Sequence, residues 1–318
     1  MDRGHSHDRQ VLTDVLAGFG ALVAVIVVGW VAGRARVLGD GAAGVLSRLS
    51  YFVATPALLL LTLAEADPGA LLSPALVASG GSAVLCALLY IGLARWRWRS
   101  RPGELATGAL ASSYVNAGNL GVAIAAYVLG DASYVAPVLL FQVLVLAPVG
   151  LTVLAGSRAE SRSRLLTQPL RTPVVVGCAL GLIVAAAGWT LPPLVRQPID
   201  LLAALAIPAA LLSYGMSLHG APRPASGEGA GQVWLVVVLK TVVQPVLAYA
   251  LGRWVAHVDG VALLAVVLTS ALPTAQNVFV YATAYDRGTR LARDTILLST
   301  VLSVPVLAVV AVLLTHPS

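Results

Sequence analysis

The sequence predicts an all-α membrane protein with ten transmembrane helices, arranged as two inverted five-helix repeats. Hydrophobic residues make up 58% of the 318 residues, while Asp, Glu, Lys and Arg together make up only 11%. Soluble globular proteins carry roughly 25% charged residues, so this composition excludes a soluble fold. A membrane helix needs about 20 apolar residues, so the chain has room for about ten spans.

The spans predicted in the first half are apolar runs bounded by charged residues, glycine or proline. They cover residues 14–33, 43–64, 71–95, 104–129 and 132–156. The first run is a full span without a small-residue cleavage site, and three aspartates lie within the first 14 residues. These features do not fit a signal peptide, so we expect a retained first helix.

The spans predicted in the second half cover residues 172–190, 197–218, 232–256, 260–285 and 291–314. Ten spans sort the loop arginines onto two sides of the membrane. One side receives Arg34, Arg36, Arg48, Arg95, Arg97, Arg99, Arg101, Arg158, Arg162, Arg164, Arg171, Arg223, Arg287, Arg290 and Arg293. The other side receives only Arg3, Arg9, Arg196 and Arg253.

This asymmetry predicts the orientation of the chain, because cytoplasmic loops carry the excess of basic residues. The arginine-rich side is then cytoplasmic, and both termini lie outside the cytoplasm. We expect a multi-pass protein of the inner (plasma) membrane. The net charge of +6 is read as this topology signal, so no nucleic-acid partner is expected.

The two halves of the chain match one another in order at a nearly constant spacing. The pairs are Arg95 and Arg253, Ser112 and Ser270, Asn119 and Asn277, Tyr127 and Tyr285, Pro148 and Pro305, and Gly29–Gly33 and Gly177–Gly181. They predict a first repeat over 1–156, a cytoplasmic linker over 157–171 and a second repeat over 172–318. Because five is odd, the second copy enters the membrane from the opposite side, an architecture typical of transporters.

Two of the predicted spans contain residues that break helices in the middle of the membrane. In the fourth these are Asn116, Gly118, Asn119 and Gly121, and in the ninth they are Pro273, Thr274, Gln276 and Asn277. Unwound backbone is tolerated in a membrane only where protein or a cavity surrounds it. Two such breaks would offer half-helix N-termini and side-chain amides to a common pocket, for which a small organic anion is the natural ligand. The alternative is that these residues only pack helices together.

The residues at these breaks resemble a known family. The run Ala-Leu-Pro-Thr-Ala-Gln-Asn-Val-Phe-Val-Tyr-Ala at 271–282, followed by Tyr285, and Asn116 placed five residues before Gly121 are similar to bacterial auxin efflux carriers. These are relatives of the plant PIN-FORMED carriers and, more distantly, of the bile-acid sodium symporters. Ala123 departs from the pattern, since a proline is usual there, so glycine and asparagine would have to break the fourth helix.

The resemblance implies a fold and a mechanism. The fourth and ninth helices would cross, helices one, two, six and seven would form a scaffold domain, and the remaining six would form a transport domain. The resemblance also implies elevator-type alternating access and a homodimer. The expected substrate is a carboxylate, either auxin-like or a dicarboxylate.

Two further polar residues are candidates for the same site. Lys240, the only lysine, lies well inside the eighth span, where it either attracts a carboxylate or extends its amine to the inner surface. Gln142, in the fifth span, either lines the site or bonds neighbouring helices. No cofactor and no metal site are expected, because the five histidines and the two cysteines have no metal-ligand spacing.

Enzyme motifs are absent from the sequence, which contains no H-E-x-x-H, G-x-S-x-G or Walker A pattern. We therefore expect a carrier rather than an enzyme. Two alternatives stay open, an intramembrane enzyme acting on a lipid or a peptide and a sodium-coupled symporter of the bile-acid type.

The predicted topology can be tested by cysteine labelling. With Cys86 and Cys178 replaced, a cysteine introduced at Ser6 should react with a membrane-impermeant reagent added outside intact cells. A cysteine at Ser161 should react only after the cells are opened. The reverse pattern would show that the number of spans is wrong.

Overall fold

The computed structural model describes residue 20 and the ranges 23–39, 41–65, 73–121, 124–125, 129, 131–156 and 173–315. This part of the chain is helical, and its one β feature is an isolated antiparallel bridge between Val115 and Thr274. Ala123 and the predicted linker 157–171 lie outside the described residues. The all-α prediction is confirmed within these ranges.

The helices of the first half begin with an unlabelled helix, Val23–Ala35. It is followed by α2 (Ala42–Leu49), η1 (Ser50–Ala54), α3 (Thr55–Ala64), α4 (Pro74–Trp98), α5 (Pro102–Ser113), η3 (Ala117–Gly121), η4 (Ala132–Val135), α7 (Ala136–Phe141), η5 (Gln142–Leu146) and α8 (Ala147–Gly156). Where these helices are described, their ends fall within a few residues of the predicted spans.

The helices of the second half are α10 (Pro173–Ala186), α11 (Pro193–Ala204), α12 (Ala206–Leu218), α13 (Ala230–Val238), η7 (Leu239–Val243), α14 (Gln244–Ala250), η8 (Leu251–Val255), α15 (Gly260–Ser270), α16 (Asn277–Tyr285) and α17 (Thr289–Thr315). Across the described residues, six continuous helical segments are long and apolar enough to cross a membrane. They are Ala42–Ala64, Pro74–Trp98, Ser133–Gly156, Pro193–Leu218, Ala230–Val255 and Thr289–Leu314.

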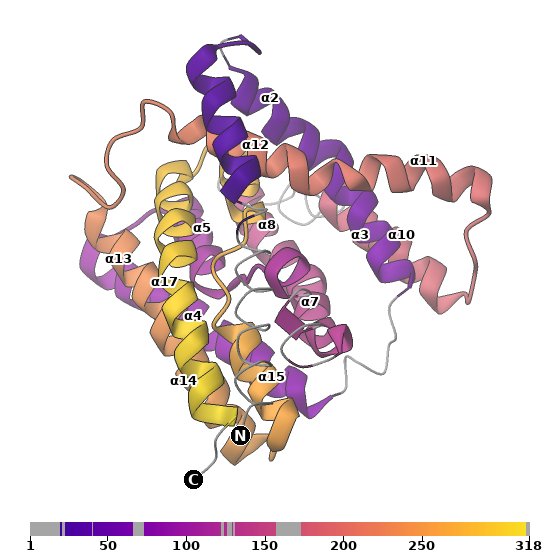
Figure 1. Cartoon of the computed structure of the whole chain (residues 1–318), viewed down its shortest axis with the longest axis vertical. Coiled ribbons are helices and arrows are strands. Elements are labelled where there is room, and N and C mark those ends of the chain that lie inside the picture. Colours follow the sequence, from indigo (N-terminus) through magenta and orange to yellow (C-terminus); the bar gives the residue numbers. More distant parts are fainter. Residues whose placement is uncertain are drawn as a thin grey trace, which may run out of the picture.

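Figure 1 shows these helices in two groups. The N-terminal helix, α2 and α12 lie at the top, and α3, α10 and α11 extend from them to the right. The helices α4, α13, α14, α15 and α17 occupy the lower left. Segments far apart in sequence therefore form each group.

Glycines let helices of the first group approach closely. A Cβ added to Gly29 would lie 2.5 Å from the carbonyl oxygen of Leu212, and one added to Gly177 would lie 2.5 Å from that of Pro56. The N-terminal helix therefore packs on α12 in the way that α10 packs on α3. Small residues at such contacts are typical of membrane helices, whose association depends on close packing.

Three of the five π-helical turns in the described residues lie within long helices, and each of these three ends two residues before a proline. The turns η1, η5 and η7 precede Pro56, Pro148 and Pro245 respectively. Proline donates no backbone hydrogen bond and its ring clashes with the preceding turn, so widening that turn relieves the clash. Single π-turns often occur at functional sites, and here two of them contain Gln142 and Lys240.

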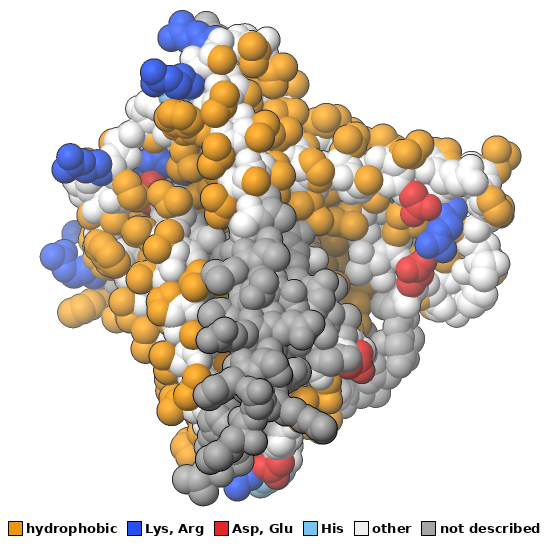
Figure 2. Space-filling view, viewed as in Figure 1, with side chains coloured by type: hydrophobic (Ala, Val, Ile, Leu, Met, Phe, Trp, Pro, Cys, Tyr) orange, Lys and Arg blue, Asp and Glu red, His pale blue; other side chains and the backbone are white. Residues whose placement is uncertain are grey.

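The two ends of the molecule differ in charge. Figure 2 shows basic side chains gathered along the upper left edge, whereas basic and acidic side chains lie together at the right and at the bottom. Both described arginines of the predicted outer side are paired with carboxylates: Arg196 lies 2.6 Å from Glu65, and Arg253 contacts Asp259. The unbalanced positive charge of the described residues is thus concentrated at the predicted cytoplasmic end.

A pair of glycine substitutions tests the helix packing. Gly177→Ala should lower stability by about 1–3 kcal/mol, because its Cβ would meet the backbone of α3. Gly92→Ala is the matched control, since no atom lies within 4 Å of the added Cβ in α4 and alanine favours a helix. Melting temperatures in detergent measure both effects, and equal stability of the two variants would contradict the packing described here.

Candidate functional site

Two unwound segments cross at the centre of the second helical group. One follows the end of α5 at Ser113, and the other joins α15 to α16. Their backbones pair around the Val115–Thr274 bridge: the Asn116 amide donates to the Pro273 carbonyl at 2.8 Å, and the Ala275 amide donates to the Tyr114 carbonyl at 3.1 Å. Each break therefore supplies hydrogen-bond partners that the other has lost.

Side chains from neighbouring helices complete this pairing. The Val115 amide donates to Oε1 of Gln142 on η5, and the Thr274 amide donates to Oγ of Ser299 on α17 at 3.1 Å. Ser299 lies 157 residues after Gln142, the spacing that also relates Pro148 to Pro305. Sequence analysis missed Ser299, although this spacing would have pointed to it.

Thr274 also ties its segment to the other broken helix. Its hydroxyl donates to the carbonyl oxygen of Ala111, in the last turn of α5, at 2.7 Å. The fully buried Thr274 thus holds the crossing in place, and the protein already accepts its hydroxyl proton. Pro273, whose carbonyl accepts from Asn116, likewise belongs to the framework of the crossing.

Two side-chain amide nitrogens near the crossing are buried without a hydrogen-bond partner. They are Nδ2 of Asn116 and Nε2 of Gln142, and both side chains are less than 4% exposed. Buried polar groups are nearly always hydrogen-bonded, so an unpartnered donor in an apolar setting calls for an explanation. A bound acceptor such as a carboxylate oxygen would satisfy a donor of this kind.

The beginning of α16 adds a positive end to this arrangement. Gln276 is its N-cap and is buried, and Asn277 is its first residue and is half-buried. The N-terminus of a helix carries a partial positive charge, although the first-turn amides of Val278 and Phe279 already donate to nearby carbonyl oxygens. Together with the amide of Asn116, this end favours an anion.

The predicted glycines of the fourth span have different surroundings. Gly118 is exposed, whereas Gly121 is buried, and a Cβ on Gly121 would lie 3.0 Å from Cδ1 of Leu272. Gly121 therefore allows the first segment to pack against the second. Asn119 lies in η3, and its side chain is outside the described residues.

Lys240 lies inside the protein, which shows that the alternative of a side chain extended to the surface is wrong. Its side chain is fully buried, and Nζ donates to Oε1 of Gln244 and, at 3.4 Å, to the carbonyl oxygen of Ser270. Gln244 in turn donates through Nε2 to the carbonyl oxygen of Ser113 at 3.4 Å. Both carbonyls belong to the last residues of the half-helices α5 and α15.

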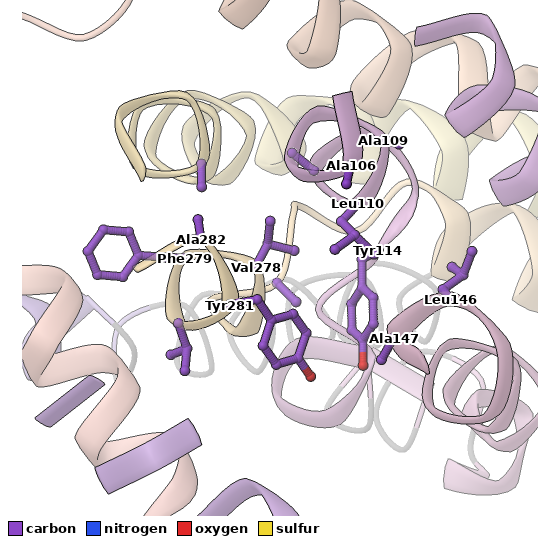
Figure 3. Close-up of a cluster of buried hydrophobic side chains, with 14 of the residues drawn as sticks. Ala106, Ala109, Leu110, Tyr114, Leu146, Ala147, Val278, Phe279, Tyr281 and Ala282 are labelled. Atoms are coloured by element: carbon purple, nitrogen blue, oxygen red, sulfur yellow. The ribbon is translucent and has the colours of Figure 1, made fainter. Parts of the chain in front are cut away.

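An aromatic cluster borders the crossing on its other side. Figure 3 shows Tyr114 beside Tyr281, and their rings meet edge to face with centroids 6.4 Å apart. Tyr281 also meets Tyr51, whose hydroxyl lies 2.7 Å from that of Tyr285. Because Tyr51 belongs to η1, these contacts join the crossing to the first helical group. The motif search had singled out Tyr285 but not Tyr51 or Tyr114.

The comparisons with known proteins agree with a membrane carrier. The family described as "Membrane transport protein" matches residues 19–164 and 160–311. The chain is also similar to a protein of Rhizobium meliloti (strain 1021) named "Putative malonate transporter". The two are 30% identical over 275 residues, which cover 83% of this chain and 84% of the relative.

The role of Gln142 in holding the crossing can be tested by stability. Gln142→Leu should lower stability by about 1–3 kcal/mol, because the buried amide of Val115 loses its acceptor. Thr300→Val is the control, since the Thr300 hydroxyl is buried without a partner and its loss should cost little. Thermal unfolding in detergent measures both variants, and an unchanged midpoint for Gln142→Leu would refute this role.

Proposed function

The chain belongs to the membrane transport protein family, and from this premise we propose that it carries small carboxylate anions across the membrane. The family and the relative are transporters rather than enzymes. The relative's name makes malonate and similar short carboxylates the first substrates to test. Membership in the family agrees with the resemblance to bacterial auxin efflux carriers.

The observation that carries the proposal is the pair of unpartnered donors at the crossing. Asn116 and Gln142 each bury an amide nitrogen without an acceptor, and α16 begins beside them. A carboxylate has two oxygens that accept several hydrogen bonds, so one ligand can satisfy donors from more than one helix. Gln276 and Asn277 are proposed to contact the same ligand.

We further propose that the two repeats are inverted copies of one another. We also propose that transport occurs by elevator-type alternating access, in which one helical group moves relative to the other. Support comes from equivalent interactions in the two halves: the glycine contacts of the N-terminal helix and of α10, and the acceptors Gln142 and Ser299. In this proposal the first helical group is the scaffold and the second slides against it. The bonds from Tyr51 to Tyr285 and from Tyr214 to the Arg293 carbonyl would break and re-form as it moves.

The assembly and the location follow from the same proposal. Exposed apolar side chains on α11, such as Leu194 and Leu201, fit either lipid or the second copy expected in a homodimer. The chain would lie in the inner membrane, with both termini outside the cytoplasm. The lipid bilayer is then its permanent environment, and a small organic anion is its transient partner.

A sodium-coupled symporter is the second candidate function. Hard cations such as sodium favour oxygen ligands, often carboxylates. In the described part of the chain, the buried charged side chains are Lys240 and Asp294, and Asp294 is paired with Arg293 at 2.7 Å. Among the described residues, the crossing therefore has no free carboxylate to bind a cation, whereas it has amide donors that could bind an anion. We therefore favour the anion carrier.

The proposed function predicts that Asn116→Ala weakens anion binding without unfolding the protein. A hydrogen bond to a charged group contributes about 1.5–3 kcal/mol, so malonate affinity should fall roughly 10- to 100-fold. Stability should change little, because the amide nitrogen of Asn116 has no protein partner to lose. Uptake of labelled malonate by reconstituted vesicles and titration of the purified protein measure these effects.

The matched control for this variant is Ser303→Ala. Ser303 is a buried polar residue of α17 whose hydroxyl bonds within its own helix to Thr300 at 2.9 Å. Its replacement should leave malonate affinity unchanged. If Asn116→Ala lost stability but kept full affinity, Asn116 would serve packing only. If no carboxylate moved in either direction under any ion gradient, the transport proposal itself would fail.

A further inference from the structure

Lys240 is a buried cation that has no acidic partner among the described residues. Its hydrogen bonds go to the amide oxygen of Gln244 and the carbonyl oxygen of Ser270, both of which are neutral groups. The buried carboxylate of Asp294 belongs to the inner end of α17, where Arg293 and the backbone of Ala225 bind it. Burying an unpaired charge costs several kcal/mol of desolvation free energy, so we looked for an interaction that offsets this cost.

The position of the ammonium shows what it interacts with. The half-helices α5 and α15 both end at the crossing, and each helix C-terminus carries a partial charge of about −0.5. Lys240 binds the last carbonyl of α15 directly and reaches that of α5 through Gln244. A protonated Lys240 therefore opposes two negative helix ends, whose partial charges sum to about −1.

This neutralisation matters for an anion at the same crossing. Without the ammonium, the two carbonyl ends would repel a carboxylate bound by Asn116 and the first turn of α16. An ion such as sodium would then have to accompany each anion and bind those carbonyls. The residue at the equivalent place in the first half is Ser82, at the repeat spacing of 158, so the crossing holds this cation from one half only.

We propose that Lys240 is a built-in cation of the anion site, which replaces a co-transported cation and lets the protein bind carboxylates without sodium. This inference rests on the proposed function. Lys240 is a positioning residue in this account, since it acts on the ligand through the ends of α5 and α15. The π-turn η7, which Pro245 imposes on the eighth span, contains the lysine.

The test measures malonate binding by the purified protein in choline buffer, with and without sodium. The wild-type protein should bind malonate equally well in both buffers. Lys240→Gln keeps a hydrogen-bond donor but removes the charge, and should bind malonate roughly 10- to 100-fold more weakly. Lys240→Arg keeps the charge and should retain most of the affinity. Thr241→Val is the control, because the neighbouring Thr241 hydroxyl bonds within its own helix to Val237 at 2.8 Å.

Each outcome decides the inference. A wild-type protein that binds malonate only with sodium would overturn it, whether or not the variants fold. A folded Lys240→Gln variant with wild-type affinity would overturn it as well. Partial recovery of Lys240→Ala by methylammonium, but not by the bulkier tetramethylammonium, would support it. If the wild-type protein neither binds nor moves any carboxylate, the failure belongs to the proposed function instead.

Discussion

The need to satisfy backbone hydrogen bonds away from water shapes the centre of this protein. Lipid offers no partners for an unwound segment, so a helix that breaks within a membrane must find donors and acceptors inside the protein. Here each broken helix finds them in the other, through the paired backbones around Val115 and Thr274. Gln142 and Ser299 accept hydrogen bonds from the backbone amides of Val115 and Thr274, which the backbone pairing does not satisfy. These bonds tie η5 and α17 to the crossing.

The hydrogen-bonding groups at the crossing differ in whether the protein provides them with a partner. The carbonyl ends of α5 and α15 are occupied by Gln244 and Lys240, whereas the amide nitrogens of Asn116 and Gln142 have no acceptor. The protein thus binds these two carbonyl acceptors, whereas the two amide nitrogens have no acceptor within the described residues. If the side-chain amides only joined helices, we would expect their nitrogens to have acceptors on neighbouring helices. The unpartnered amide nitrogens therefore favour ligand binding over helix packing more clearly than the mere presence of polar residues does.

Much of this architecture could be predicted from the sequence, because apolar runs and helix-breaking residues act locally. The break in the ninth span followed from Pro273, and the limits of most described helices followed from charged or proline residues. The surroundings of Lys240 could not be predicted, since its neighbours Gln244 and Ser270 come together only when two spans pack. Ser299 was also missed, although its distance of 157 residues from Gln142 matches the spacing between the two halves. The π-turns η1, η5 and η7 were also missed, although a proline follows each of these three by two residues and could have indicated their positions.

The central claim, that the crossing of the two broken helices is the anion site, is tested most directly by locating a bound anion. An experimental structure with bromomalonate would place the heavy bromine atom by its anomalous signal. The account predicts a peak beside the amide of Asn116 and the first turn of α16. A cavity of about 190 Å³ lies elsewhere in the protein and is lined by Glu104, Arg290 and Asp294 among others. Bromine found only there, with the crossing empty, would contradict the account.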